Sequence, residues 1–464
     1  MKRFAKIILW SLGGICALVI LGLIGINLYL QSSDVQQRIR IATERAIGAP
    51  LSIHRTMFTP WTGLILSGLT MPDPVMENAN MLEAPSFSMK FEFLPLFRKQ
   101  FIISEITLSH PQLVLRQNEK GKWVVRSEEL EKPEEPPQRP ERPREPRETR
   151  ERRVPKFEVE LRKFTIRDGE GTFLDRKGRV VARFKQLQID GRLSGPSSAN
   201  GDIWIEEIEL GGRLFPKRLR AHFEQEGTHL AVTNVKAALA GGRIRATFHL
   251  TTPRGGGQSE FEFSGEVEDV SIPKLIAEAH GDDANTSGSI GGTVHLKGNP
   301  AASESITGEG DFALLEAKLK PLDAIQKIGS LLRIDELQML DLEQAEFHFD
   351  VHDEAVWVKD LTLQTENVII SGEGPVKFSG ELDLDGRLMI SEKLQENLAG
   401  IIGDQFEPSE NAKYKQVGFF VRGRLDRPKT NLIEKVTGLP PSVGGFLKGL
   451  LQVTRPDKKT DDKE

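Results

Sequence analysis

The sequence predicts a mostly β protein, in which an N-terminal transmembrane helix precedes a long, curled antiparallel β-sheet with a few short helices. Three observations support this fold class: an apolar run near the N-terminus, apolar residues that alternate with polar ones through most of the chain, and little helical periodicity between them. A strand turns successive side chains to opposite faces, so a period of two predicts one apolar face and one polar face.

Composition argues against several functional classes. The chain has 464 residues and a formal net charge of −5, which argues against nucleic-acid binding. Its 24 Phe residues outnumber its 2 Tyr residues, as suits an apolar face without hydroxyl groups. Cys16 is the single cysteine, so an intramolecular disulfide is impossible and a cysteine metal site is not expected.

Residues 1–32 are expected to form a membrane anchor. The run at residues 7–30 is apolar and uncharged, and it is long enough to span a bilayer as a helix. Lys2, Arg3 and Lys6 precede it, which places the N-terminus in the cytoplasm and the rest of the chain beyond the membrane. A cleaved signal peptide is the alternative, but the run is too long for one and no small-residue cleavage site follows it.

Residues 33–130 are predicted to combine one helix with strands. Ser33 is a suitable N-cap for a helix over residues 34–47, which ends at Gly48. Strand patterns begin just after this helix. A pair of strands around a turn at His110-Pro111 is indicated by four alternating residues, namely Ile106, Leu108, Leu113 and Leu115.

Residues 131–156 form a segment of a different kind. Between residues 132 and 155 the chain is almost wholly Pro, Glu, Arg and other polar residues. Such a composition has no apolar surface to bury, so we expect a solvated, flexible linker or loop. Its mixed charge offers a site for an envelope protein partner, which is the alternative interpretation.

Strand patterns resume over residues 157–300, and a further β domain is predicted over residues 301–430. The clearest alternation lies in residues 345–384, where we interpret the Gly-Glu-Gly at 372–374 as a break between strands. We also interpret the Gly-Glu-Gly at 308–310 as a turn. A helix over residues 322–332 is predicted to close one end of the sheet or to cover its apolar side. Residues 431–464 are expected to hold an amphipathic helix and a charged tail.

A long sheet with one apolar face has two possible forms. If it curls without closing, the apolar face lines a groove in which acyl chains can lie, at a gain of about 0.8 kcal/mol for each buried methylene. If it closes into a sandwich or barrel, side chains fill the same face. Periodicity does not separate the two. The candidate lining residues in either case are Phe347, Phe349, Val351, Val376, Phe378, Leu382 and Leu384.

Residue patterns typical of catalysis are missing from the sequence. It contains no phosphate-binding G-x-x-x-x-G-K-[ST] and no nucleophile elbow G-x-S-x-G. His348, Asp350 and His352 share one face of a predicted strand and suggest a divalent cation site in principle, but a solvated polar face is the simpler interpretation. We therefore expect no enzyme activity, no metal and no cofactor.

The two ends of the chain resemble AsmA-like proteins. At the N-terminal end the resemblance is carried by DVQQRIRIATERAIGAPLSI and SEITLSHPQLVLRQNEKGKW, and at the C-terminal end by GEGDFALLEAKLKPLDAIQKIGSLLRI and VGFFVRGRLDRPK. The family's C-terminal glycines and final proline correspond to Gly308, Gly310, Gly372, Gly374, Gly423 and Pro428. The likeness fades between about residues 120 and 300, where the linker departs from the family pattern.

This resemblance implies a location and a role. AsmA-like proteins are anchored in the inner membrane of diderm bacteria, face the periplasm and share the curled β-groove of chorein and TamB-like bridge proteins. The resemblance therefore implies a single-pass inner-membrane protein that binds or conducts phospholipid and supports outer-membrane lipid homeostasis and assembly. The alternative is a non-catalytic scaffold that affects the targeting or biogenesis of outer-membrane proteins.

Overall fold

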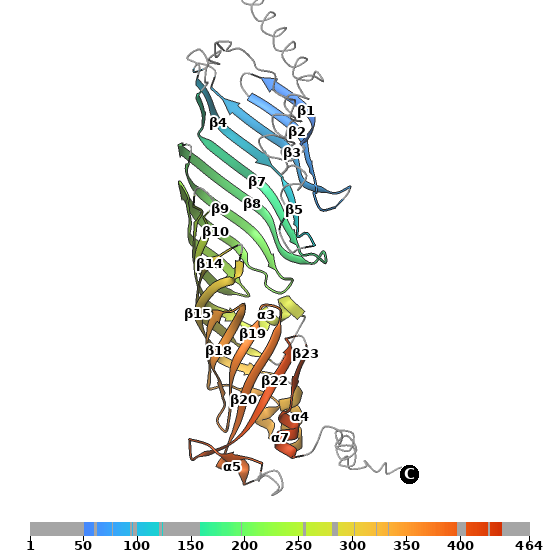
Figure 1. The fold of residues 1–464 in the computed structure, drawn as a ribbon, viewed down its shortest axis with the longest axis vertical. Coiled ribbons are helices and arrows are strands. Elements are labelled where there is room, and N and C mark those ends of the chain that lie inside the picture. Colours follow the sequence, from blue (N-terminus) through green and yellow to red (C-terminus); the bar gives the residue numbers. More distant parts are fainter. Residues whose placement is uncertain are drawn as a thin grey trace, which may run out of the picture. The chain divides into compact units, whose positions relative to one another are not determined.

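The computed structural model describes residues 51–59, 63–76, 78–92, 95, 100–119, 123, 158–195, 197–253, 257–280, 286–300, 302–321, 323–332, 334–396, 405–425 and 427–438. The chain divides into two compact units, Met1–Leu239 and Ala240–Glu464, each described by itself below (Figure 1). Both are built mainly from strands, with short helices in the second, so the prediction of a mostly β protein is confirmed. The predicted segment 157–300 spans the boundary between the units.

Unit 1 contains eleven strands among its described residues. They are β1 (Ser52–Thr59), β2 (Gly63–Pro72), β3 (Asn80–Phe91), β4 (Gln100–Ser109), β5 (Gln112–Arg116), β6 (Glu158–Leu161), β7 (Lys163–Leu174), β8 (Val180–Gly195), β9 (Ser198–Leu210), β10 (Lys217–Glu226) and β11 (His229–Leu239). Most neighbours are antiparallel, but β4 pairs in parallel with β6 and β7, and β5 in parallel with β7. The prediction of a wholly antiparallel sheet is therefore wrong.

The predicted turn at His110-Pro111 is also wrong. β4 and β5 do not pair with each other; both lie between β3 and β7, with the register unchanged across the break. The His110 N–H donates to the Arg167 carbonyl at 2.7 Å, and His110 and Asp168 both have positive φ, 51° and 50°. The chain therefore bends at His110-Pro111 within one long strand and does not turn back there.

Unit 2 contains twelve strands among its described residues. They are β12 (Gly242–Thr251), β13 (Glu260–Ser271), β14 (Ser287–Asn299), β15 (Ala302–Leu319), β16 (Leu340–Asp341), β17 (Gln344–His352), β18 (Ala355–Gln364), β19 (Val368–Lys377), β20 (Glu381–Ser391), β21 (Glu407–Pro408), β22 (Tyr414–Arg424) and β23 (Arg427–Thr430). β12 to β15 pair in order, β15 pairs with β17, and the antiparallel ladder continues through β18, β19, β20 and β22 to β23.

The helices of unit 2 lie at one end of its sheet. Among the described residues they are α3 (Ile272–His280), α4 (Asp323–Leu332), the 3₁₀ helix η3 (Asp335–Leu337), α5 (Glu392–Gln395) and α7 (Leu432–Thr437). α3, α4, α5 and α7 follow β13, β15, β20 and β23, which all run in the same direction. We call this edge the helix end. The opposite edge, the hairpin end, carries tight turns such as those at residues 353–354 and 378–380.

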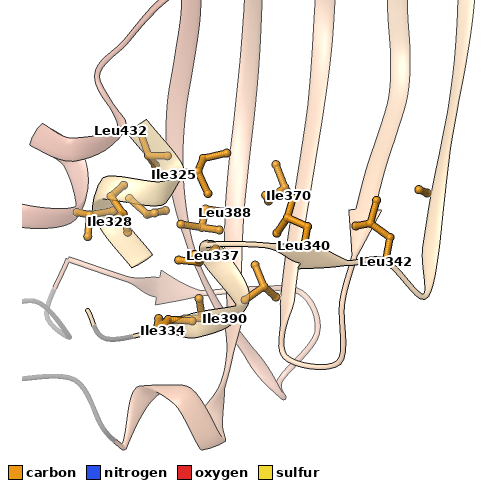
Figure 2. Packing of buried hydrophobic residues seen from close by; sticks show 14 of the residues in the cluster. Ile325, Ile328, Ile334, Leu337, Leu340, Leu342, Ile370, Leu388, Ile390 and Leu432 are labelled. Carbon is orange, nitrogen blue, oxygen red and sulfur yellow. The ribbon is translucent and has the colours of Figure 1, made fainter. Parts of the chain in front are cut away.

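The core of unit 2 fills the helix end. Ile325 and Ile328 of α4 and Leu337 of η3 pack against Leu388 of β20 and Leu432 of α7 (Figure 2). Ile328, Leu337 and Leu388 are fully buried. The helix predicted over residues 322–332 is confirmed, and it covers the apolar side of the sheet at that end. The structure adds α3, whose Pro273 near its first turn is a signal for a helix start.

Both Gly-Glu-Gly segments lie inside strands. Gly308 and Gly310 belong to β15, while Gly372 and Gly374 belong to β19, so their interpretation as breaks or turns is wrong. The turn after β19 falls instead at Gly380, whose φ of 86° suits glycine.

Unit 1 has a smaller core of its own, formed by Leu51, Leu66, Leu69, Met71, Met81 and Ala84. Among the residues that the structure describes, no helix is both long and apolar enough to cross a membrane. The predicted anchor at residues 7–30, the helix at 34–47, the linker at 132–155 and the last helix after residue 440 lie outside the described residues.

Candidate functional site

The register of unit 2 brings distant apolar residues into rows on one face of the sheet. Directly opposed residues of antiparallel strands point their side chains to the same face. Val351 lies opposite Val356, which lies opposite Val376, which in turn lies opposite Leu382. Three of the predicted lining residues therefore stand in a single row. We call this face of β12 to β22 the apolar face.

The other predicted residues divide between this face and its rim. Phe349 is buried and lies opposite Val358, while Leu384 is half-buried and lies opposite Val421. Phe347 lies opposite Phe312 of β15, and their ring centroids are 5.6 Å apart. Phe378 differs from the rest because it follows the last residue of β19, in the hairpin turn, with 48% of its surface exposed.

The apolar face extends beyond the residues that the sequence analysis selected. Phe248 lies opposite Phe263, which lies opposite Leu296, and Leu296 lies opposite Gly308. Gly308 in turn lies opposite Val351, so the row of Val351 continues from β12 to β20. Alternation of apolar and polar residues predicts the two faces of each strand. It does not predict which residues of neighbouring strands lie opposite each other, and the rows depend on that register.

The packing of this face changes along the strands. At the helix end the core residues are covered by α4, η3 and α7. Toward the hairpin end, Val356, Val358, Val376, Leu384 and Val421 are only half-buried and do not belong to that core. The helices therefore fill one part of the apolar face, and the same face continues past them without a helix over it among the described residues.

Ion pairs cover the opposite face. Arg422 Nε donates to Asp383 Oδ1 at 2.6 Å, and Asp350 is paired with Lys359. The hydrogen bond from its ammonium group to the Asp350 carboxylate raises the pKa of Lys359. Asp350 lies between Phe349 and Val351 in β17, so its side chain points to the opposite face. This strand therefore has one charged face and one apolar face.

The histidines singled out in β17 do not form a metal centre with Asp350. His348 is exposed, and His352 stacks on Trp357 with its Nδ1 2.9 Å from the Asp353 carboxylate. Within the described parts of the chain, no three His, Cys, Asp or Glu residues gather to hold a metal ion.

A cavity of about 490 Å³ opens among β18, β19, β20, β22 and the start of α7. Its lining includes Gly372, Gly386 and Phe419, together with the charged residues Lys359, Asp360, Glu373, Asp385 and Arg387. The two glycines lie side by side in neighbouring strands, opposite each other. Asp385 and Arg387 flank Gly386 along β20, so their side chains point to the charged face, and the cavity opens mainly on that face.

A comparison with known families bears on the N-terminal third of the chain. The model of the AsmA family matches residues 1–164. Over these residues the chain is AsmA-like. This AsmA-like part includes β1 to β6, and it confirms the resemblance that the N-terminal motifs predicted. No curated protein and no solved structure matches the chain. The C-terminal likeness to AsmA-like proteins stays a prediction.

Proposed function

We propose that this chain is a non-catalytic, lipid-binding protein of the bacterial envelope that holds phospholipid acyl chains against its apolar face. The observation that carries the proposal is the continuation of that face past the helix-end core, where Val358, Leu384 and Val421 are half-buried without a helix over them. A ligand that covers this row of aliphatic side chains gains about 25 cal/mol of binding free energy for each Å² of apolar surface removed from water.

A phospholipid fits such a face, because its acyl chains can lie on the apolar side chains while its head group stays in water. The AsmA family match is consistent with a role in the assembly of envelope lipids or proteins. In this proposal, residues 7–30 anchor the chain in the inner membrane, and the rest of the chain lies in the periplasm.

Photo-crosslinking in the intact protein tests the proposal. We would place a photoreactive residue at three positions of β20 in the full chain, expressed in a diderm bacterium: Leu384 on the uncovered part of the apolar face, Asp385 on the charged face and Leu388 under the helices. We expect a phospholipid adduct in the mass spectrum at Leu384 and none at the other two positions.

The controls separate the proposal from a solid scaffold. Asp385 is one residue away but faces the other side, so an equal adduct there indicates general contact with membrane lipid. If Leu384 and Val421 both give no lipid adduct, the apolar face is filled and the scaffold alternative stands. Deleting residues 132–155 is then the next experiment, because a scaffold that recruits its partner through this segment loses function, whereas a groove keeps it.

A further inference from the structure

Several phenylalanines lie directly opposite glycines of a neighbouring strand, in both units. In five cross-strand pairs, a Phe of one strand is in register with a Gly of the neighbouring strand. These pairs are Phe164–Gly191, Phe223–Gly201, Phe312–Gly292, Phe349–Gly310 and Phe419–Gly386. Because opposed residues share a face, each ring has an empty position beside it.

In three pairs, those of Gly191, Gly310 and Gly386, the opposing ring occupies the space that a side chain on the glycine would need. At Gly201 and Gly292 the atom nearest to an added Cβ is a backbone carbonyl oxygen, and the ring lies slightly farther away. A Cβ built on Gly386 would lie 2.5 Å from Cζ of Phe419, and one on Gly191 would lie even closer to the ring of Phe164. Carbon atoms in contact are about 3.5–4.0 Å apart, so no side chain fits there. Since the far edge of the ring reaches the neighbouring strand at the height of a Cβ atom, the ring lies across the sheet rather than upright on it.

Rings that lie across the sheet differ from the side chains of a filled core, which project away from the sheet. Where two sheets pack about 10 Å apart, their inner side chains interdigitate to fill the space between them. A ring lying over a glycine packs against its own sheet. The rings of Phe223 and Phe349 are buried, whereas Phe164, Phe312 and Phe419 are half-buried and stay partly open to solvent. Phenylalanine suits this position better than tyrosine, because its flat ring has no hydroxyl that must find a partner in an apolar layer.

We infer that these glycines set the depth of the lipid-binding groove. Each glycine lets the opposing ring lie down, so that the rings form a low floor along which acyl chains run. A methyl group at the glycine lifts the ring and narrows the groove. This inference rests on the proposed function, since it concerns how the same face accepts its ligand.

A purely structural role is the alternative. Glycine in a strand costs stability relative to alanine, and a ring laid over it shields the exposed backbone. Under that alternative the rings protect the fold, and the space above them has no occupant. The two roles differ in what a folded Gly→Ala variant does to lipid capture.

Gly386→Ala is the best test because the three atoms nearest to its new Cβ all belong to the Phe419 ring. We would combine it with the photoreactive residue at Leu384, which is two positions away on the same strand and face, in the full chain. The matched control is Gly418→Ala, beside Phe419, where a Cβ meets no atom within 4 Å. We expect the lipid adduct to fall about fivefold in Gly386→Ala, as overpacking displaces the ring, and to stay unchanged in Gly418→Ala.

A second substitution supplies the rescue. Phe419→Leu shortens the side chain that the new methyl group displaces, so Gly386→Ala with Phe419→Leu should regain most of the adduct. The inference is overturned if Gly386→Ala melts within about 2 °C of the parent protein and keeps its full lipid adduct. The proposed function survives that result, whereas it fails if the parent protein itself gives no adduct.

Unit 1 offers an independent version of the test if Gly386→Ala does not fold. The three atoms nearest to a new Cβ in Gly191→Ala belong to the Phe164 ring, and Gly195→Ala on the same strand meets nothing within 4 Å. With the photoreactive residue at Ile189, we expect the first to lower the adduct and the second to leave it unchanged. If Gly191→Ala and Gly386→Ala both prevent folding while their controls fold, the glycines serve the fold alone and the inference is wrong.

Discussion

The side-chain amide of Asn367 donates a hydrogen bond of 2.6 Å to the carboxylate of Glu336. This bond ties η3, which covers the apolar face, to the turn between β18 and β19. The same carboxylate accepts from Thr365 Oγ1 at 2.8 Å, and Thr365 and Asn367 are both buried. The position of η3 therefore depends on this network as well as on the buried side chain of Leu337.

Replacing Glu336 by Ala is therefore expected to destabilise unit 2. It leaves the Asn367 amide and the Thr365 hydroxyl with fewer partners, at a cost of about 1–3 kcal/mol. Urea unfolding measures the loss. Glu366→Ala is the matched control, because Glu366 lies in the same turn and its side chain is 71% exposed. Equal losses in the two variants would show that the network does not hold η3.

The two parts of the apolar face should respond differently to truncation. Ile328 is fully buried in the helix-end core, so Ile328→Ala should lower the free energy of unfolding by about 2–5 kcal/mol. Leu384 is half-buried beyond that core, so Leu384→Ala should cost less than about 1.5 kcal/mol. Denaturant unfolding of both variants checks the difference. A Leu384→Ala loss as large as that of Ile328→Ala would mean that this part of the face is packed like a core.

Sequence patterns predicted the faces of strands well and their partners poorly. The alternation of Phe347, Phe349 and Val351 with charged residues correctly indicates a strand with one apolar face. The stripe that includes Ile325 and Ile328 likewise predicts α4. Both signals are local, arising from the geometry of a single element.

The errors come from residues whose meaning depends on a distant strand. The sequence pattern indicates a turn at Pro111, but β7 holds the chain in one register on both sides of it. The pattern also indicates a turn at Gly310, but the missing side chain there makes room for the ring of Phe349 in the next strand. Local propensity cannot distinguish a glycine that turns the chain from one that makes room for a neighbour.

A buried ion pair in unit 1 gives a third prediction. Arg116 Nε donates to Asp73 Oδ2 at 2.8 Å, and the Asp73 side chain is only 2% exposed. Arg116→Met leaves a buried carboxylate without its cation, which should cost about 3 kcal/mol. Arg213→Met, at an exposed arginine outside the cores, is the control in the same unfolding measurement. A loss below about 0.5 kcal/mol in Arg116→Met would show that the pair adds nothing to stability.

The pair of His222 and Asp202 predicts a dependence of stability on pH. His222 Nδ1 lies 2.9 Å from Asp202 Oδ1, and this hydrogen bond raises the pKa of His222 in the folded protein. A raised pKa means that the folded state binds the proton more tightly than the unfolded state. The stabilisation is therefore complete below the unfolded histidine pKa of about 6.5, and it is lost as pH rises through the higher pKa of the folded protein.

His222→Gln should remove this contribution. Because the pair is partly exposed, the free energy of unfolding of wild type should exceed that of the variant by less than about 1 kcal/mol at pH near 5.5. The difference should be gone near pH 8.5. Urea unfolding at the two pH values measures it, with His249→Gln, an exposed histidine in a strand of the other unit, as the control. A wild-type advantage that grows with pH would reverse the predicted sign, and it would show that the neutral imidazole is the form that Asp202 holds.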